Sequence, residues 1–486
     1  MHFTTDILVI GAGITGCSVA REVSRFDCSA MVIDRAGDVA EGATKANSGI
    51  VHAGYDAVTG SAKAKYNVQG AAMFPSLCEK LGVPYRRNGA LVIGLTPEDS
   101  QTIQKLYDRG VANGVKELRI LDGAEALALE PNLNPAVLCA LLVPTSAIVS
   151  PYELAFALAD DAAVNGVSFR FDEEVVSVLP VDGAFEVRTK ENVYSCRVVI
   201  NCAGSSSAAI HNQLTKDSLE IIHRRGQYYL LDRMASPVFD RTIFQCPSVM
   251  GKGVLVSPTV HNNLLIGPTA EDIPDPWDTA TTASGLANIL QKAAVTWPKL
   301  NTRSNITNFS GVRAHLASDD FLVGPVSGCP GAFEAVGIES PGLSSAPAIG
   351  VDLAAQAAGY LGISRKASLA PLPARPKPFH SMTDEEREAA WKSDPDYGTI
   401  VCRCEVVTEA EIKAAIHRPV GARTIDGIKR RTRAGMGRCQ GGFCMPRVAA
   451  ILAQETGHSL LDIQKDGRGS YILDHTIDDA EGRNSL

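Results

Sequence analysis

A glycine-rich turn between a buried strand and a helix is the feature that most constrains this chain. Asp6 to Ile10 (DILVI) has the apolar composition of a buried parallel strand, and Gly11 to Gly16 (GAGITG) follows it as a G-x-G-x-x-G turn that opens a helix. Helical spacing of apolar residues runs from Ile14 to Phe26. Glycines in such a turn let the backbone approach a pyrophosphate at the helix N-terminus. A second apolar strand, Ala30 to Ile33, ends at Asp34, whose carboxylate can accept hydrogen bonds from ribose hydroxyls.

The sequence therefore predicts a Rossmann-like dinucleotide-binding unit, and this motif alone does not distinguish NAD from FAD. The residues that we expect at the dinucleotide in this turn and strand are Gly11, Gly13, Ile14, Thr15, Gly16 and Asp34.

The composition of the 486-residue chain is that of an ordinary globular protein, with 45% hydrophobic and 21% charged residues. Its length predicts about three folding units. A net charge of −8 disfavours a nucleic-acid-binding protein. No apolar run is long enough for a transmembrane segment, and the N-terminus lacks a secretory signal. We expect a cytoplasmic protein, with peripheral association at the inner face of the membrane as the alternative location.

A proline-rich segment divides the chain. Ala370 to Phe379 (APLPARPKPF) holds four prolines, and polar residues follow to Gly398, so we expect residues 370–398 to form an extended, semi-rigid linker. The linker separates an α/β body, residues 1–369, from a compact module over residues 399–465, and residues 466–486 are expected to form a tail. Within the body, short apolar runs between Arg224 and Gly267 predict a mixed or antiparallel sheet.

Four of the twelve cysteines are paired in the module, as Cys402-x-Cys404 and Cys439-x4-Cys444. Four thiolates on two short turns can hold a [2Fe–2S] cluster or a tetrahedral zinc ion, and C-x2-C pairs are more usual for zinc. Between the pairs, Thr408-x-x-Glu411 predicts a capping box at the start of a helix. Cys444 lies at the start of another predicted helix, Phe443 to Gln454, where the helix dipole favours a thiolate.

A basic run, Lys429 to Arg433 (KRRTR), is also part of the module. Basic runs that bind nucleic acid usually have aromatic residues among them, and this one has none. We expect these side chains to form a solvated helix face.

One histidine lies in a small, glycine-rich loop, Asn47 to Gly54 (NSGIVHAG). The imidazole of His52 could take the proton of a substrate hydroxyl while a hydride leaves the adjacent carbon. Judged by spacing alone, a structural role for His52 is the more common one.

From Asp6 to about Leu361 the chain resembles the D-amino-acid-oxidase-type flavoenzyme superfamily. Within that group it is most similar to the flavin-linked glycerol-3-phosphate dehydrogenases and oxidases, with the L-2-hydroxyglutarate dehydrogenases as near relatives. Besides the glycine-rich turn, the matching stretches are ANSGIVHAG (46–54), AKYN (64–67), RRGQYYLL (224–231), GKGVLVSP (251–258), LIGPTA (265–270) and ESPGLSSAPAI (339–349). Residues 399–456 resemble the bacterioferritin-associated-ferredoxin-like [2Fe–2S] domain, which ends several flavin dehydrogenases.

The resemblance implies FAD as the dinucleotide and assigns roles to particular residues. His52 would be the base beside the flavin ring, with Ser48 next to the ring. Lys252 and Arg313 would hold the anionic end of the substrate, and Ser340 would be a further pocket residue. Ala203 and Gly204 would make a second contact with the dinucleotide, and Gly342, Leu343 and Ser344 would begin a helix that points at the pyrimidine end of the flavin. Cys402, Cys404, Cys439 and Cys444 would hold the [2Fe–2S] cluster.

The chemistry of Arg313 and Lys252 agrees with this anion-binding role. An arginine guanidinium, which donates two hydrogen bonds in a fixed geometry, and a lysine ammonium together suit a partly buried phosphate or carboxylate. Without the resemblance, Arg313 would be expected to pair with Asp319 or Asp320 at the surface, and Lys252 to be a solvated turn residue.

The expected fold class is α/β: a Rossmann-like FAD-binding domain (about 1–80, 150–215 and 310–369), a mixed-sheet substrate domain (about 81–149 and 216–309) and a small, mainly helical [2Fe–2S] domain. The expected function is that of an FAD-dependent dehydrogenase of a small anionic 2-hydroxy compound, namely sn-glycerol 3-phosphate, which gives dihydroxyacetone phosphate. Electrons would pass from the flavin through the cluster to an acceptor subunit or a quinone pathway. The alternatives are an L-2-hydroxyglutarate dehydrogenase, an opine or amino-acid dehydrogenase, or a non-catalytic electron-transfer subunit.

Overall fold

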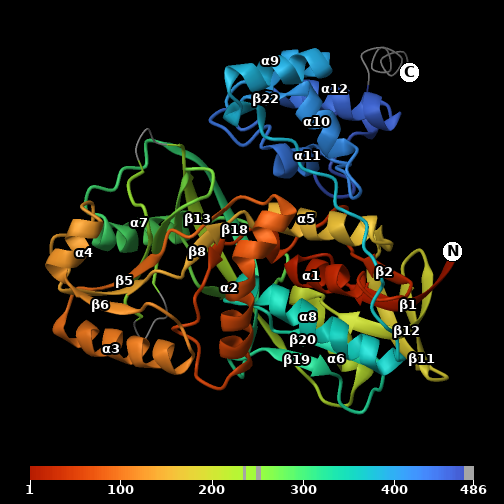
Figure 1. Ribbon diagram of the computed structural model, residues 1–486, viewed down its shortest axis with the longest axis horizontal. Helices are drawn as coiled ribbons and strands as arrows, with labels where there is room; N and C mark the ends of the chain where they lie inside the picture. Colours follow the sequence, from red (N-terminus) through yellow and green to blue (C-terminus); the bar gives the residue numbers. More distant parts are fainter. Residues whose placement is uncertain (234–236, 248–252, 476–486) are drawn as a thin grey trace, which may run out of the picture.

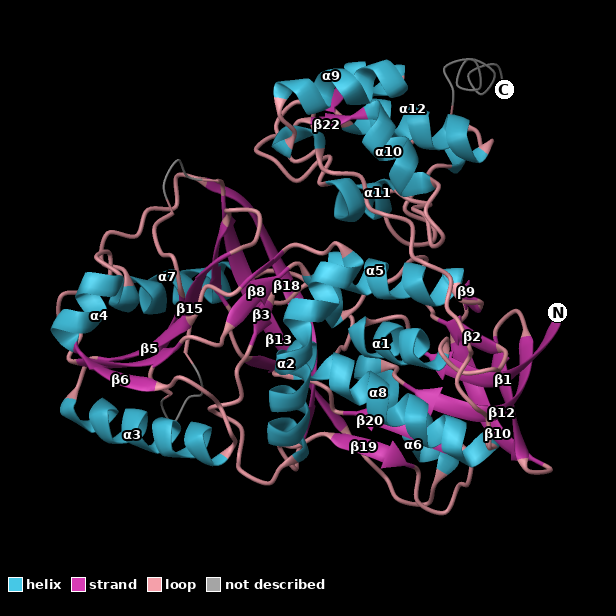
Figure 2. Ribbon diagram, in the orientation of Figure 1, coloured by secondary structure: helices cyan, strands magenta, loops and turns pink. Residues whose placement is uncertain are grey.

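The computed structural model describes residues 1–233, 237–247 and 253–475, and it shows a large body with a smaller module above it (Figure 1). Nearly all strands lie in the body, whereas the module is mostly helical (Figure 2). The α/β fold class with a helical C-terminal part is therefore confirmed. Among the described residues, no helix is long and apolar enough to cross a membrane.

The first sheet of the body has the N-terminal strand near its centre. Strand β1 pairs in parallel with β2 on one side and with β12 on the other, and β2 and β12 continue in parallel to β9 and β20. The strands are β1 (His2–Ile10), β2 (Ala30–Ile33), β9 (Val167–Arg170), β10 (Val175–Val181), β11 (Ala184–Thr189), β12 (Val193–Asn201), β19 (Leu322–Pro325) and β20 (Ala332–Val336).

Both faces of this sheet are covered, as its apolar sequence predicts. Ile7 and Val9 are part of a core shared with the helices on one face, and Leu8 and Ile10 belong to a second core on the other face. The helices on the first face are α1 (Ile14–Val23), α2 (Ala62–Leu81), α5 (Pro151–Val164) and α8 (Gly342–Leu361), and α6 (Ser207–Leu214) lies on the second. The strand, turn and helix predicted at the N-terminus are thus confirmed.

Helix α1 is shorter than the apolar spacing suggests. It ends at Val23, and Ser24 is its C-cap residue. Phe26, which was expected inside the helix, instead forms an isolated β-bridge with Arg365. A contact with a segment far along the chain therefore ends this helix one turn early.

The second sheet of the body is a mixed sheet whose longest strands are β13 and β18, which are antiparallel neighbours. This confirms the mixed sheet expected between Arg224 and Gly267. Its strands are β5 (Ala90–Gly94), β6 (Arg119–Asp122), β7 (Cys139–Val143), β13 (Ile221–Leu231), β14 (Thr242–Gln245), β15 (Leu255–Pro258), β16 (Leu264–Gly267), β17 (Glu271–Ile273) and β18 (Asn305–Leu316).

Three helices and a small sheet complete the body. The helices are α3 (Pro97–Ala112), α4 (Gly123–Leu129) and α7 (Ala283–Thr296), and the small sheet has β3 (Ile50–Val51), β4 (Tyr85–Arg86) and β8 (Ala147–Val149). Strand β3 carries the chain directly into His52, so this short pairing fixes the place of the histidine loop.

The segment over residues 370–398 is extended only in its first part. Residues 370–378 have no regular structure, in keeping with their prolines. Helix α9 (Asp384–Ser393) follows, with Thr383 and Glu386 forming a capping box. The expectation of an extended linker is therefore wrong for α9, because a strong N-terminal cap and a run of good helix formers outweigh the polar composition.

The module is built from short helices around its own apolar core. After α9 come β21 (Ile400–Cys402), β22 (Val407–Thr408), α10 (Glu409–Ile416), α11 (Ile425–Thr432) and α12 (Met445–Thr456). The capping box of Thr408 and Glu411 is present at the start of α10, as predicted.

The basic run in α11 is buried, so the prediction of a solvated helix face is wrong. Arg430, Arg431 and Arg433 are each less than a tenth exposed. Their partners explain why: Arg431 donates to both carboxylate oxygens of Asp38 in the body, at 2.6 and 2.7 Å. Buried arginines are stable where paired carboxylates take their hydrogen bonds.

Candidate active site

A cavity of about 1700 Å³ lies in the body and is lined by residues of both sheets. One end holds the glycine-rich turn, and His52 and Arg313 also line the cavity. Its volume exceeds the roughly 300–1,000 Å³ of ordinary small-molecule pockets. The space is therefore sufficient for a dinucleotide together with a second small molecule.

The three motif glycines are required for different reasons. Gly11 has a φ of +108°, and a Cβ placed on it would lie 2.4 Å from the carbonyl oxygen of Cys202. A Cβ on Gly16 would lie 1.8 Å from the carbonyl oxygen of Gly11. By contrast, a Cβ on Gly13 would lie 3.4 Å from the Thr44 hydroxyl oxygen, an ordinary contact distance. Gly11 and Gly16 thus serve the packing of the protein itself, whereas Gly13 keeps space open in the cavity that it lines.

Asp34 ends β2 at the same end of the cavity. Its Oδ2 accepts from the Ala12 amide at 2.6 Å, and its Oδ1 accepts from the Ala36 amide at 2.8 Å. Burial raises the pKa of this carboxyl, and the two amide hydrogen bonds oppose the rise. A carboxylate held in this way keeps lone pairs for ribose hydroxyls.

The chemistry of this end of the cavity fits FAD. An open glycine, a helix N-terminus and a fixed carboxylate are what a pyrophosphate and a ribose need. Of the predicted FAD contacts, Gly11, Gly13, Ile14, Thr15, Asp34, Ala203, Gly204, Gly342 and Leu343 line the cavity, whereas Gly16 and Ser344 do not.

His52 follows β3 and lines the same cavity. Its main-chain amide donates to the Ser344 hydroxyl at 2.8 Å, and its ring centroid lies 5.7 Å from that of Phe244. Ser344 therefore acts through the backbone of the histidine loop rather than as a cavity wall. Ser48, from the same loop, lies with its hydroxyl 3.4 Å from that of Tyr228.

Helix α8 begins at the cavity, where Gly342 and Leu343 are lining residues together with Ser340. The first amides of a helix carry partial positive charge. The end of the cavity at the N-terminus of α8 therefore favours a negatively charged group of a bound molecule.

Arg313 lies on β18, and its guanidinium donates to the carbonyl of Thr269 at 2.8 Å. Asp320 and Asp319, its expected alternative partners, make other contacts. Asp320 accepts from the first amides of α2, and Asp319 accepts from Lys63 at 2.7 Å. Arg313 thus presents a cation to the cavity, which suits an anion. Lys252 lies outside the described residues.

Sequence patterns alone do not predict a polar cluster that includes His315, two residues after Arg313 on β18. Glu339 accepts from Lys63 at 2.9 Å and contacts the His315 Nδ1 at 2.8 Å. Burial raises the pKa of Glu339, but Lys63 and His315 outweigh burial and hold this pKa below its ordinary value. Glu339 lies within the matched stretch ESPGLSSAPAI, and Lys63 directly precedes AKYN. The position of both residues in or next to matched stretches could have indicated this cluster.

The four paired cysteines of the module come together in two pairs. The Sγ atoms of Cys404 and Cys439 are 3.7 Å apart. Cys402 and Cys444 share a hydrogen bond that lowers the pKa of Cys402 to about 6 and raises that of Cys444. A Cβ on Gly437 would lie 2.3 Å from the Cys404 Cβ, so this loop can close only with glycine. Four thiols arranged as two pairs fit a two-iron cluster, which is held by four cysteines.

Family models match two parts of the chain. The model described as FAD dependent oxidoreductase matches residues 6–356, and the model described as BFD-like [2Fe-2S] binding domain matches residues 400–454.

Relatives match the chain over most of its length. It is 45% identical over 471 residues to glycerol 3-phosphate dehydrogenase of Caloramator mitchellensis, which covers 96% of this chain and 98% of that protein. It is 29% identical to glycerol 3-phosphate oxidase of Mycoplasma pneumoniae, over 71% of this chain and 92% of that protein. The solved structure of dithionite-reduced L-alpha-glycerophosphate oxidase from Mycoplasma pneumoniae with FAD bound matches with a TM-score of 0.72 and 28% identity, over 77% of this chain and 99% of that one.

Proposed function

We propose a function from one premise: the chain belongs to the family of FAD-dependent oxidoreductases and carries a BFD-like [2Fe-2S]-binding domain at its C-terminal end. It is a glycerol-3-phosphate dehydrogenase that oxidises the C2 hydroxyl of sn-glycerol 3-phosphate and releases dihydroxyacetone phosphate. The observation that carries this proposal is 45% identity to a glycerol 3-phosphate dehydrogenase over 96% of the chain, body and module together.

The oxidation removes one proton from the hydroxyl oxygen and one hydride from the carbon that bears it. FAD supplies the two-electron acceptor for the hydride. His52, which lines the cavity, takes the hydroxyl proton. A base held in place by its own loop suits this step because both transfers need a fixed geometry.

Two cations are proposed to bind the phosphate of the substrate, of which Arg313 lies on β18 of the second sheet. Arg313 supplies a guanidinium that its bond to Thr269 already holds in place, and Lys252 supplies a second positive charge. Ser48 and Ser340, which also line the cavity, supply further polar groups to the substrate pocket. The N-terminus of α8 favours the negative charge that arrives with the hydride.

A substrate panel tests this proposal and Arg313 together. Mixed anaerobically with the holoprotein, sn-glycerol 3-phosphate should bleach the visible flavin band, and inorganic phosphate should compete with it. Arg313→Ala should weaken substrate binding by about 1.5–3 kcal/mol, roughly 10- to 150-fold in Kd, because a charge-assisted contact is lost. Arg188→Ala is the matched control, since Arg188 is more than half exposed and pairs with Glu186 on β11. Bleaching by L-2-hydroxyglutarate or an amino acid, and not by glycerol 3-phosphate, would overturn the substrate assignment.

The electrons leave through the module. We propose that the cluster on Cys402, Cys404, Cys439 and Cys444 accepts them one at a time from the flavin and passes them to a partner. Cys404 is exposed at the surface, and Phe443, next to Cys444, is 88% exposed. Arg403, Arg438 and Arg447, close to the cysteines in the chain, are also exposed, and Arg438 and Arg447 pair with Asp232 and Glu409. We propose that an acceptor subunit docks on this exposed face, with a quinone pathway and peripheral membrane association as the alternative.

Metal analysis and one substitution test the proposed electron transfer through the cluster. The purified protein should contain iron and acid-labile sulfide in equal amounts and no zinc. Cys439→Ser should leave reduction of the flavin by substrate intact but remove the transfer of electrons to a one-electron acceptor. Cys28→Ser, at a half-buried cysteine outside the module, is the control. Electron transfer through the cluster is contradicted if the Cys439→Ser variant reduces the acceptor at the parental rate. Stoichiometric zinc in the purified protein would contradict the assignment of the site to a [2Fe–2S] cluster.

A further inference from the structure

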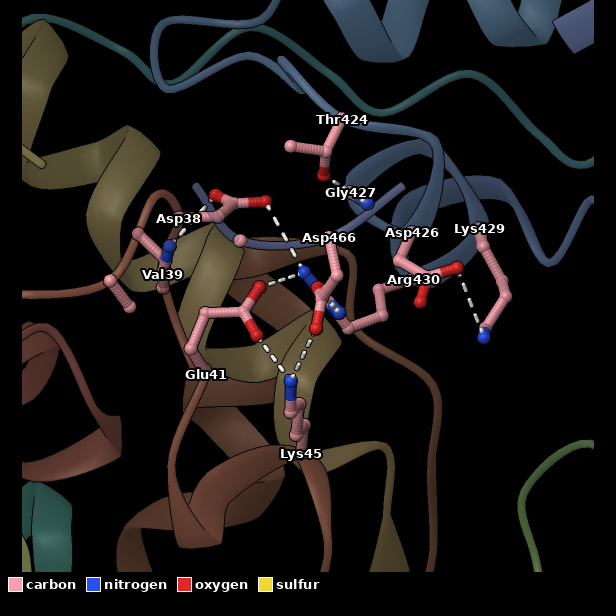
Figure 3. Close-up of polar contacts among 12 residues, drawn as sticks. Asp38, Val39, Glu41, Lys45, Thr424, Asp426, Gly427, Lys429, Arg430 and Asp466 are labelled. Carbon is pink, nitrogen blue, oxygen red and sulfur yellow. Dashed lines mark hydrogen bonds and ion pairs between the residues drawn. The ribbon is translucent and has the colours of Figure 1, made fainter. Parts of the chain in front are cut away.

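Several ion pairs join the module to the body, among them that of Arg418 with Asp160. One group of them falls on a short segment, residues 38–45, which we term the docking segment (Figure 3). Arg431 of α11 makes a two-pronged contact with Asp38, and Arg430 pairs with Glu41. Asp466 bonds to Arg430 at 3.1 Å and to Lys45 at 3.1 Å. Asp38 is 3% exposed and Arg431 8%, so this pair of charges is withdrawn from water when the module is docked.

The other side of the docking segment contacts the glycine-rich turn. The amide of Ala40 donates to the carbonyl of Ala12 at 3.0 Å. The Thr44 hydroxyl accepts from the amide of Ile14, the first residue of α1, at 2.9 Å. Residues 41–45 also line the cavity itself. The segment therefore lies between α11 and the turn at which we expect the pyrophosphate.

We infer that docking of the module and binding of FAD are linked through the docking segment, with Arg430 and Arg431 as positioning residues for the FAD site. This inference rests on the FAD site of the proposed function. When α11 holds Asp38 and Glu41, the segment is fixed in the place where Ala40 and Thr44 support the turn. When α11 leaves, the buried Asp38 loses its arginine partners while Glu41 keeps Lys45, so the segment must rearrange to hydrate the Asp38 carboxylate.

Linkage of this kind is reciprocal. If docking raises the affinity for FAD by some factor, bound FAD raises the stability of docking by the same factor. The protein therefore assembles its two redox parts in a correlated way: a chain that holds FAD also holds the cluster module in contact with the body.

Substitutions on α11 test the linkage. Arg431→Gln and Arg430→Gln should each raise the Kd for FAD, measured by titrating the apoprotein and following the quenching of flavin fluorescence. A typical coupling corresponds to about 5- to 150-fold. Lys429→Gln is the matched control: it removes the same charge from the same helix, but Lys429 pairs with Asp426 inside the module (Figure 3). Its Kd should equal that of the parent.

A second measurement uses the parent chain alone and so does not depend on how a variant folds. Limited proteolysis within residues 370–378, or hydrogen exchange in α11, should be slower with FAD than without it. The inference is overturned if FAD leaves both unchanged, or if the Arg431→Gln variant has an undocked module and the parental Kd. A parent that binds no FAD would instead overturn the proposed function.

Discussion

Replacing Gly13 with valine should abolish FAD binding and leave the fold of the protein intact. Gly13 has an extended backbone, with φ −73° and ψ −178°, which any residue can adopt. Among the described residues beyond its two chain neighbours, the atom within 4 Å of a Cβ at this position is the Thr44 hydroxyl oxygen, at 3.4 Å, so there is room for the side chain. The valine would occupy the space that the pyrophosphate needs. The variant should be colourless as purified and show no flavin fluorescence change on titration with FAD.

Two comparisons make this experiment specific. Gly359→Val on α8 is the control, because a Cβ there meets no atom within 4 Å in the described part of the chain outside its own helical turn. Gly16→Val should fail in another way: its Cβ would collide with the Gly11 carbonyl, so the fold itself should be lost. A yellow Gly13→Val protein that releases FAD on denaturation would contradict the assignment of the turn.

Replacing His52 with glutamine should lower the rate of flavin reduction by about 10²- to 10⁴-fold, the usual contribution of a positioned base. FAD binding should stay near that of the parent, because the contact with Ser344 is made by the main-chain amide and survives the substitution. The measurement is rapid anaerobic mixing with sn-glycerol 3-phosphate, following the visible flavin band.

The control is His417→Gln, at a largely exposed histidine that pairs with Glu455 in the module. A His52→Gln variant that is reduced at the parental rate would assign His52 a structural role against Phe244.

Local signals in the sequence predicted local structure well. The strand, glycine-rich turn and helix at the N-terminus depend on neighbouring residues, and so does the capping box of Thr408 and Glu411. Helix α9 was not predicted, although it has a capping box of its own at Thr383, because the prolines before it indicated an extended segment.

Features that depend on distant partners were not predictable from pattern. The burial of Arg431 requires Asp38, which is 393 positions away in the chain. The cluster of Lys63, His315 and Glu339 likewise combines three separate segments. The proposed role of His52 rests on resemblance to a family, because spacing alone favours a structural histidine. The sequence thus predicted the dinucleotide-binding turn, but not the contacts of α11 with residues 38–45 that lie next to the turn.

The ion pair between Asp38 and Arg431 also has a consequence for how the protein is made. Ribosomes add about 5–20 residues per second, and domains near the N-terminus fold first. Asp38 is therefore synthesised on the order of 20–80 seconds before its partner, which lies 393 positions later. Throughout that time the nascent nucleotide domain carries a carboxylate that has no counterion from α11. The module, which is synthesised after the body, supplies this counterion, so the contact distinguishes chains that extend through α11 from those interrupted before it.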